Sequence, residues 1–270
     1  MNGERGMMQT VLGKRGILNP KTGETKFHLS RHLPSPDLAF FVQRYWYVCW
    51  DLNEPYRQEV IQYPCVNLVF EQGKSGIFGI PSTKSSHLLE GRGKVFAVKF
   101  NPGAFYPFVK MPISQLTDTC VDIEQVFGEE SRCLEHAVLS TDDVDEMIRL
   151  TECFLRERLP ERDDNVVVVN QIIDCIMSDR TITKVDDLVE RIGIHKRSLQ
   201  RLFRQYVGVS PKWVIQRFRL HEAAELLVEG QVSDLTRMAL DLGYFDQAHF
   251  IKDFKTVVGK TPAEYARQAE

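Results

Sequence analysis

The first half of the chain has the hydrophobic pattern of a β-rich domain. Short runs of aromatic and β-branched residues, separated by Gly, Pro and Ser, predict strands. These runs are Phe40–Trp50, Val66–Phe70, Gly76–Ile80 and Val95–Phe100. The strand-like pattern continues from Pro36 to about Gly128, whereas residues 1 to about 33 are expected to form a tail or an irregular segment.

Helical spacing begins in Asp142–Leu159 and continues through the second half. Pro160 ends the first helix, the polar stretch Glu161–Asn165 is a natural linker, and every segment from Val166 onward is helical or a tight turn. We therefore predict an α+β two-domain fold, with a β-rich domain over residues 1–160 and an all-α domain over residues 165–270. The helix Asp142–Leu159 is too apolar for an exposed linker, so we expect it to pack on its own domain or on a second copy of the chain.

One pattern occurs twice in the helical half, in Val185–Pro211 and Leu235–Pro262. Gly193 matches Gly243 at an offset of 50 residues, and three later positions match at an offset of 51, so the second copy has one extra residue after its turn. These pairs are Phe203 with Phe254, Gly208 with Gly259, and Pro211 with Pro262. A chance origin is improbable.

Each copy is typical of a helix-turn-helix. An apolar stripe predicts the first helix, and a glycine follows where a tight turn needs a positive φ. The stripes are Val185, Leu188, Val189 and Ile192 in copy one, and Leu235, Met238, Ala239 and Leu242 in copy two. Asp246 is a good N-cap for the second helix of copy two, and His195 is a weaker one in copy one.

The second helix of copy one predicts a base-reading face. Leu199, Leu202, Phe203 and Tyr206 face the core, which leaves a polar stripe outside, without a carboxylate: Lys196, Arg197, Gln200, Arg201 and Arg204. Arg and Gln make bidentate bonds to guanine and adenine edges in the major groove. A solvated basic face is the alternative interpretation of the same residues.

The second helix of copy two has a less polar outer face. We expect Phe250, Phe254 and Val257 to point inward and five residues to point outward, namely Gln247, Ala248, Ile251, Lys252 and Lys255. Lys252 and Lys255 suit phosphate contacts, and Ala248 or Ile251 suits a thymine methyl. Asp253 falls on the inward side, where an ion pair with Arg217 or Arg219 would satisfy it.

A long helix from Pro211 to about Val228 joins the two copies. Ser210-Pro211 and Thr261-Pro262 both have a capping hydroxyl before a proline at the first helical position. At 1.5 Å per residue the joining helix would span roughly 27 Å. Such a spacer could hold two helices in successive major-groove turns, which lie about 34 Å apart.

The net charge of −3 by itself argues against nucleic-acid binding, but the charged residues are unevenly distributed along the chain. The stretch Arg191–His221 holds eight Lys or Arg residues and no Asp or Glu. Such a block can neutralise several phosphates although the whole chain is acidic.

Residues 166–267 resemble the DNA-binding domain of the AraC/XylS family of transcription regulators. The resemblance rests on LQRLFRQYVGVSPKWVIQRFRL and ALDLGYFDQAHFIKDFKTVVGKTPAEY. It implies seven helices, with base-reading positions at Arg197, Gln200 and Arg201 in the first unit and around Gln247, Ala248, His249 and Lys252 in the second. Two departures, Val189 for a small alanine and His195 for a Ser or Thr cap, affect packing and capping.

The resemblance also implies that the first half senses a small molecule, mediates dimerisation, or both. Its segments YPCVNLVFEQG and GKVFAVKFNPGAFYPF resemble an N-terminal domain of some family members. Its aromatic residues are expected to form a core rather than a pocket: Tyr45, Trp46, Trp50, Phe70, Phe100, Phe105 and Tyr106. The sequence does not indicate which residues would bind an effector.

The expected function is therefore a cytoplasmic transcription regulator that binds double-stranded DNA, with an effector, a homodimer partner and RNA polymerase as further possible partners. We expect no membrane span, enzymatic activity, metal or cofactor, and the scattered cysteines suit reduced thiols. One alternative is a DNA-repair protein with an alkyl-accepting cysteine, although Cys65 has apolar neighbours. The other is an architectural DNA binder.

Overall fold

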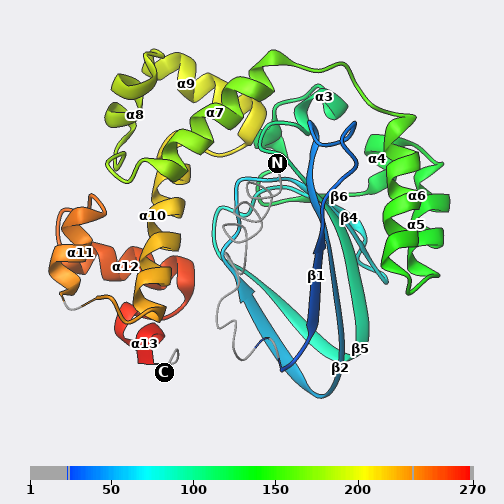
Figure 1. Cartoon of the computed structure of the whole chain (residues 1–270), viewed down its shortest axis with the longest axis horizontal. Coiled ribbons are helices and arrows are strands. Elements are labelled where there is room, and N and C mark those ends of the chain that lie inside the picture. The colour runs from blue at the N-terminus through cyan, green and yellow to red at the C-terminus, as the bar shows by residue number, and fades with distance from the viewer. Residues whose placement is uncertain (1–22, 24, 233, 268–270) are drawn as a thin grey trace.

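The computed structural model describes residues 23, 25–232 and 234–267. An antiparallel sheet occupies the first half of the chain, and helices make up the second half (Figure 1). Helices α4 (Ile123–Phe127), α5 (Ser131–Leu139) and α6 (Val144–Arg156) lie at one side of the sheet, and the helices of the second half lie at the other. The predicted α+β architecture, a β-rich part followed by an all-α part, is confirmed.

The sheet has the strand order β1-β2-β5-β3-β4-β6, with antiparallel pairing throughout. All four predicted strands are present, and two of them, β2 (Val42–Val60) and β5 (Ser85–Phe100), are longer than predicted because they pair with each other along most of their length. The strands are β1 (His28–His32), β2 (Val42–Val60), β3 (Asn67–Glu71), β4 (Gly76–Phe78), β5 (Ser85–Phe100) and β6 (Cys120–Val121). The expectation of an irregular segment up to residue 33 is wrong for β1, whose residues pair with Tyr45–Cys49 of β2.

Short helical segments follow the sheet where a strand-like pattern was expected up to Gly128. Prolines and caps explain them: Pro107 lies in the first turn of one segment, and Asp122 accepts a hydrogen bond from the Glu124 N–H at the start of another. The segments are α3 (Tyr106–Val109), the 3₁₀ turn η1 (Ile113–Gln115) and α4 (Ile123–Phe127), followed by α5 (Ser131–Leu139). The expectation is wrong at these positions.

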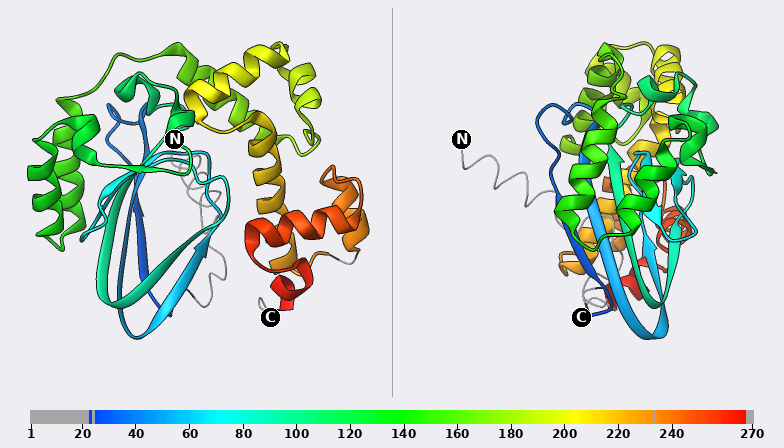
Figure 2. Two further views of the ribbon diagram at one scale, coloured as in Figure 1. Left: turned by 180° about the vertical axis from the view of Figure 1, so that it is seen from behind. Right: turned by 90° about the vertical axis from the view of Figure 1, so that its right-hand side faces the viewer.

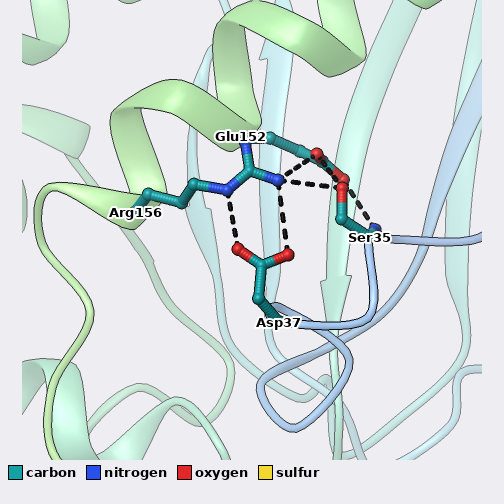
Figure 3. A network of polar contacts seen from close by, with 4 residues as sticks. All are labelled: Ser35, Asp37, Glu152 and Arg156. Atoms are coloured by element: carbon teal, nitrogen blue, oxygen red, sulfur yellow. Dashed lines mark hydrogen bonds and ion pairs between the residues drawn. The ribbon is translucent and has the colours of Figure 1, made fainter.

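Helix α6 (Val144–Arg156) corresponds to the predicted helix and packs on its own domain. Met147 and Leu155 are buried in the core that includes the sheet. The polar network of Figure 3 ties its last turns to the segment before β2: Arg156 Nε lies 2.7 Å from an Asp37 oxygen, and Glu152 accepts hydrogen bonds from the Ser35 N–H (2.8 Å) and hydroxyl. The helix is therefore anchored without a second copy of the chain.

The second half contains the two predicted helix pairs. Helix α10 runs between α7–α9 at one end and α11–α13 at the other (Figures 1 and 2). Helix α9 continues into a π-helical turn, η2, which ends at Gly208 with a φ of 94°. The elements are α7 (Asp164–Ser178), α8 (Val185–Ile192), α9 (Lys196–Leu202), η2 (Phe203–Val207), α10 (Pro211–Val228), α11 (Leu235–Asp241), α12 (Gln247–Val258) and α13 (Pro262–Arg267).

The first helix pair shares a hydrophobic core with the sheet, whereas the second has a core of its own. Ile113 and Leu116 belong to the same buried cluster as Leu199 and Phe203, and the Thr117 hydroxyl donates to the Gly208 carbonyl at 2.8 Å. The second cluster contains Phe250 and Phe254, joined by Ile61 from the end of β2. The first helix pair is therefore fixed against the sheet domain.

Within the described ranges, no helix is long and apolar enough to cross a membrane.

Candidate DNA-binding interface

The first helix pair forms its turn as the sequence predicts. Leu188 of α8 is fully buried, and Gly193 has a φ of 68°, which a residue without a Cβ adopts at no steric cost. His195 caps α9, because its Nδ1 accepts a hydrogen bond from the Arg197 N–H at 3.2 Å. The cap and the turn fix the direction in which α9 leaves the core.

Helix α9 and η2 separate an apolar face from a polar one. Leu199, Phe203 and Tyr206 are buried, and Leu202 is partly buried. All five predicted base-reading residues are exposed on the opposite side: Lys196, Arg197, Gln200, Arg201 and Arg204. The side chains of the last four make no hydrogen bond or ion pair with any residue that the structure describes, and so their donors are available to a ligand.

Lys196 differs from the other four residues. Its Nζ lies 2.7 Å from an Asp186 oxygen of α8, so a carboxylate of the neighbouring helix reaches this face, although α9 itself carries none. Both side chains are exposed, and such pairs contribute little because water screens them. Lys196 must exchange this partner for a phosphate or a base to contact DNA.

The second helix pair has a similar turn with a stronger cap. Gly243 has a φ of 82°, and a Cβ there would lie 2.4 Å from the side chain of Thr183, so only glycine fits. Asp246 caps α12 by accepting from the His249 N–H at 2.7 Å. Phe250 and Phe254 are fully buried beneath it.

The outer face of α12 agrees with most of the predicted positions. Ala248, His249, Lys252 and Lys255 are exposed. Gln247 is half-buried and its Oε1 accepts a hydrogen bond from the Thr236 hydroxyl at 3.0 Å. Ile251 was expected outside, but it is half-buried and packs against the second core.

The predicted ion pair of Asp253 with Arg217 or Arg219 is wrong. Asp253 Oδ2 lies 3.7 Å from His249 Nε2, four residues earlier on the same helix. Arg217 instead donates to the Ser82 carbonyl at 3.1 Å and lies over the Trp213 ring at 4.3 Å. Burial lowers the pKa of Arg217 to about 10.

Arg219 is the second buried arginine of α10. Its Nη1 lies 2.7 Å from Glu222, and its Nη2 donates to the Asp179 carbonyl at the end of α7, at 3.0 Å. The two arginines therefore hold α10 to the sheet domain and to α7. Sequence patterns could not assign them these roles, because the partners are backbone carbonyls distant in the chain.

An exposed aromatic side chain near α12 was not predicted. Phe245, in the turn with the extra residue, is 88% exposed, and Leu240 of α11 is 56% exposed. The extra residue of copy two is the sequence signal that could have found this position. An apolar side chain at the edge of a reading helix can contact sugars or thymine methyls.

Two regions of the chain match protein families. Residues 188–268 match a helix-turn-helix domain family, and residues 30–122 match a domain of unknown function, DUF6597. The exposed stripe of α9 and the capped turns described above therefore lie within a helix-turn-helix domain. Over part of its length the chain is similar to proteins that are named as transcription regulators.

Curated relatives are similar to part of the chain. An uncharacterized helix-turn-helix-type transcriptional regulator of Haemophilus influenzae is 35% identical over 83 residues, which are 31% of this chain and 28% of the relative. The probable transcription factor PqrA of Proteus vulgaris is 35% identical over 82 residues, or 30% of this chain and 66% of the relative. The chain thus spans less than two thirds of either relative.

Solved structures with similar parts have low overall TM-scores. A probable AraC family transcriptional regulator from Rhodopseudomonas palustris is 27% identical, with a TM-score of 0.35, and the match covers 38% of this chain and 98% of that one. ToxT from Vibrio cholerae is 12% identical, with a TM-score of 0.37, over 91% of this chain and 98% of that one. The similarity to helix-turn-helix regulators therefore rests on the sequence matches.

Proposed function

We propose that this chain regulates transcription by binding double-stranded DNA, with α9 reading bases in one major groove and α12 anchoring the protein in the next. The observation that carries the proposal is the exposed face of α9. This face presents the side chains of Arg197, Gln200 and Arg201, which can each make two hydrogen bonds to one base. None of these side chains is hydrogen-bonded to a residue that the structure describes. Side chains of this kind discriminate base pairs.

Helix α12 supports an anchoring role. It presents Lys252 and Lys255, which bind phosphates as point charges, together with Ala248 and His249 near its N-terminus. Gln247 would have to leave Thr236 to reach a base. Since α10 has 18 residues, about 27 Å at 1.5 Å per residue, the two helices can lie about one turn of DNA apart.

The sheet domain is proposed to be the regulatory part. We assign residues 1–160 to effector sensing or dimerisation and residues 165–270 to DNA binding, in the cytoplasm and without enzymatic activity. A small-molecule effector, a second copy of the chain and RNA polymerase are the proposed further partners. The shared core of the sheet and the first helix pair supports this role, because a change in the sheet domain would reach α9 directly.

The repair alternative lacks support at its cysteine. Cys65 is 3% exposed, and burial raises the pKa of its thiol, which suppresses the thiolate that alkyl transfer needs. The architectural alternative predicts affinity without base preference. The forked donors of α9 favour sequence-specific reading over it.

Selection from a randomised duplex library tests the proposal. The full chain should enrich a defined sequence, with affinity that falls steeply as salt rises, because several phosphate contacts release counterions. Enrichment of no sequence, with steep salt dependence retained, would indicate the architectural alternative. A nearly flat salt dependence would mean that the basic stripe is a solvated surface and would refute the proposal.

A further inference from the structure

A cavity of about 530 Å³ lies against the face of the sheet that is turned away from the main core. Side chains alternate between faces along a strand, so Tyr45 and Tyr47 of β2 enter the core while Trp46, Val48 and Trp50 line the cavity. The expected aromatic core is confirmed for Tyr45, Phe70, Phe100 and Phe105. Trp50 belongs to a second, smaller buried cluster against which Trp46 packs, and both tryptophans also line the cavity. Cavities that bind small molecules have volumes of roughly 300–1,000 Å³.

Strand register brings polar groups together at one end of this cavity. Lys99 of β5 is paired with Arg44 of β2 on one side and with Asn67 of β3 on the other. Arg31 of β1 is paired with Trp46, next to Arg44 on the same face. All of these residues line the cavity, so three cationic side chains from three strands converge there.

The cations are placed in an environment that disfavours charge. Burial lowers the pKa of Arg31, Arg44 and Lys99, and brings that of Lys99 to about 8. The Lys99 Nζ lies 4.5 Å from the centre of the Tyr63 ring, and no described carboxylate is within 4.0 Å of it. A cation that is buried among apolar walls is costly unless an anion compensates it.

The acidic residues that line the cavity already have partners. Glu71 lies 3.4 Å from Lys74 Nζ, and Asp118 accepts the Ser82 N–H at 2.7 Å. Towards the other end the walls include the apolar side chains of Val48, Trp50 and Leu89, together with the polar side chains of Gln58 and His87. The cavity therefore has a cationic end and a mainly apolar body.

We propose that this cavity binds an organic anion, whose charged group is held by Lys99, Arg44 and Arg31 and whose apolar body lies against Trp46 and Trp50. Asn67 would donate to the charged group through the second N–H of its Nδ2, because the first is donated to the Cys65 carbonyl at 3.3 Å and Oδ1 accepts from the Trp46 indole N–H at 3.4 Å. The proposal of a binding site follows from the cavity alone, whereas the proposal that its ligand is an effector rests on the proposed function.

A matched pair of dyes tests the site. 8-Anilinonaphthalene-1-sulfonate is an aromatic anion, and N-phenyl-1-naphthylamine has the same ring system without the sulfonate. Fluorescence titration of the full chain should show tighter binding of the anion. Lys99→Gln should weaken binding of the anion at least about tenfold, because one charge-assisted hydrogen bond is lost. Binding of the neutral dye should not change. Lys99→Arg should retain the preference for the anion.

Lys94→Gln is the matched control, because Lys94 lies on the same strand but pairs with Asp142 outside the cavity. Circular dichroism shows whether Lys99→Gln folds. If it does not, Arg44→Gln removes a different positive charge from the same end of the cavity. Equal binding of both dyes, unchanged in both variants, would overturn the proposal, and so would binding of neither dye. DNA affinity measured without dye separates this result from the proposed function: a chain that selects the anion but not DNA refutes only the latter.

Discussion

The ring of Tyr63, in the wall of the cavity, stacks on the imidazole of His221 of α10 with centroids 4.7 Å apart. Phe218, one turn earlier on α10, meets the same tyrosine ring edge-on at 5.6 Å. The ammonium of Lys99 also lies over this ring, 4.5 Å from its centroid. A single aromatic residue thus connects the cationic end of the cavity with the helix that joins the two DNA-binding units.

This contact predicts coupling between anion and DNA. An anion that attracts Lys99 weakens its contact with Tyr63 and so changes the support of α10. DNA affinity of the full chain should change about fivefold or more when 8-anilinonaphthalene-1-sulfonate saturates the cavity. The ratio of DNA affinity with the dye to DNA affinity without it measures this coupling. In Tyr63→Leu the ratio should fall close to one while the chain remains folded.

Tyr106 provides the control for that experiment. Its ring contacts Tyr206 at 4.3 Å, which is another junction between the sheet domain and the first helix pair, away from the cavity. Tyr106→Leu should therefore keep the ratio of wild type. A ratio that persists in Tyr63→Leu would show that the coupling does not pass through this ring.

Two arginines of the first unit are predicted to differ in role. Arg201→Ala should cost about 1–3 kcal/mol on the selected site and relax the preference at one base position, because a bidentate base contact is lost. Arg204→Ala should weaken all sequences to a similar degree and lower the salt slope by about 1. Electrophoretic mobility shifts on the selected site and its single-base variants measure both effects. Loss of affinity in Arg201→Ala with no change in preference would contradict the assignment.

The helical half could be predicted from sequence because its signals are local. Gly193 and Gly243 mark turns with positive φ, and Ser210 and Asp246 cap helices whose first turns immediately follow. The core positions Phe203 and Phe254 are both fully buried, as the repeat requires. Local geometry and apolar spacing were therefore sufficient to place α9 and α12.

The sheet domain was harder to predict because its organisation depends on distant contacts. Strand β1 has the sequence HLSRH, with little apolar alternation, and it exists because β2 pairs with it. Lys99, Arg44 and Arg31 are separated by many residues, and only the strand register brings them to one cavity. The shared core of Ile113 and Phe203 likewise joins segments that sequence patterns treat separately.

Anion affinity should depend on pH through Lys99. Burial, which is the largest cause, and the nearby charges of Arg44 and Arg31 together lower the pKa of Lys99 to about 8, although Cys65 opposes them. The sulfonate stays ionised, so affinity for 8-anilinonaphthalene-1-sulfonate should fall as pH rises above about 8 and Lys99 loses its proton. Lys99→Gln should show a flat profile over this range. A wild-type profile that is also flat would exclude Lys99 as the titrating contact.

The free energy of unfolding of the unliganded chain should rise over the pH range in which the affinity for the anion falls. The pKa of Lys99 in the folded chain lies below its usual 10.5, so the unfolded chain binds more protons between about pH 8 and 10. In that interval Lys99 makes the free energy of unfolding rise with pH. Comparison of urea midpoints for wild type and Lys99→Gln at pH 7.5 and 9.5 isolates this contribution.

Helix α6 should act as part of the sheet domain's core. Met147 is 1% exposed, so Met147→Ala should lower the free energy of unfolding by about 2–5 kcal/mol through the cavity it leaves. Arg149→Ala, on the exposed side of the same helix, should change it by less than about 0.5 kcal/mol. Urea unfolding followed by circular dichroism measures both. Unchanged stability in Met147→Ala with an altered sedimenting mass would assign α6 to an interface between chains.

The most direct test of the central claim compares the two DNA-binding units on one selected duplex. Helix α9 offers Arg197, Gln200 and Arg201, whereas α12 offers chiefly Lys252 and Lys255, which add affinity without base preference. The bases under each unit are scrambled separately, and the affinity of the full chain is measured at fixed salt. Scrambling under the first unit should cost several kcal/mol, at about 1–3 kcal/mol per base pair, and scrambling under the second clearly less. An equal or larger loss under the second unit would contradict the assignment of sequence reading to α9.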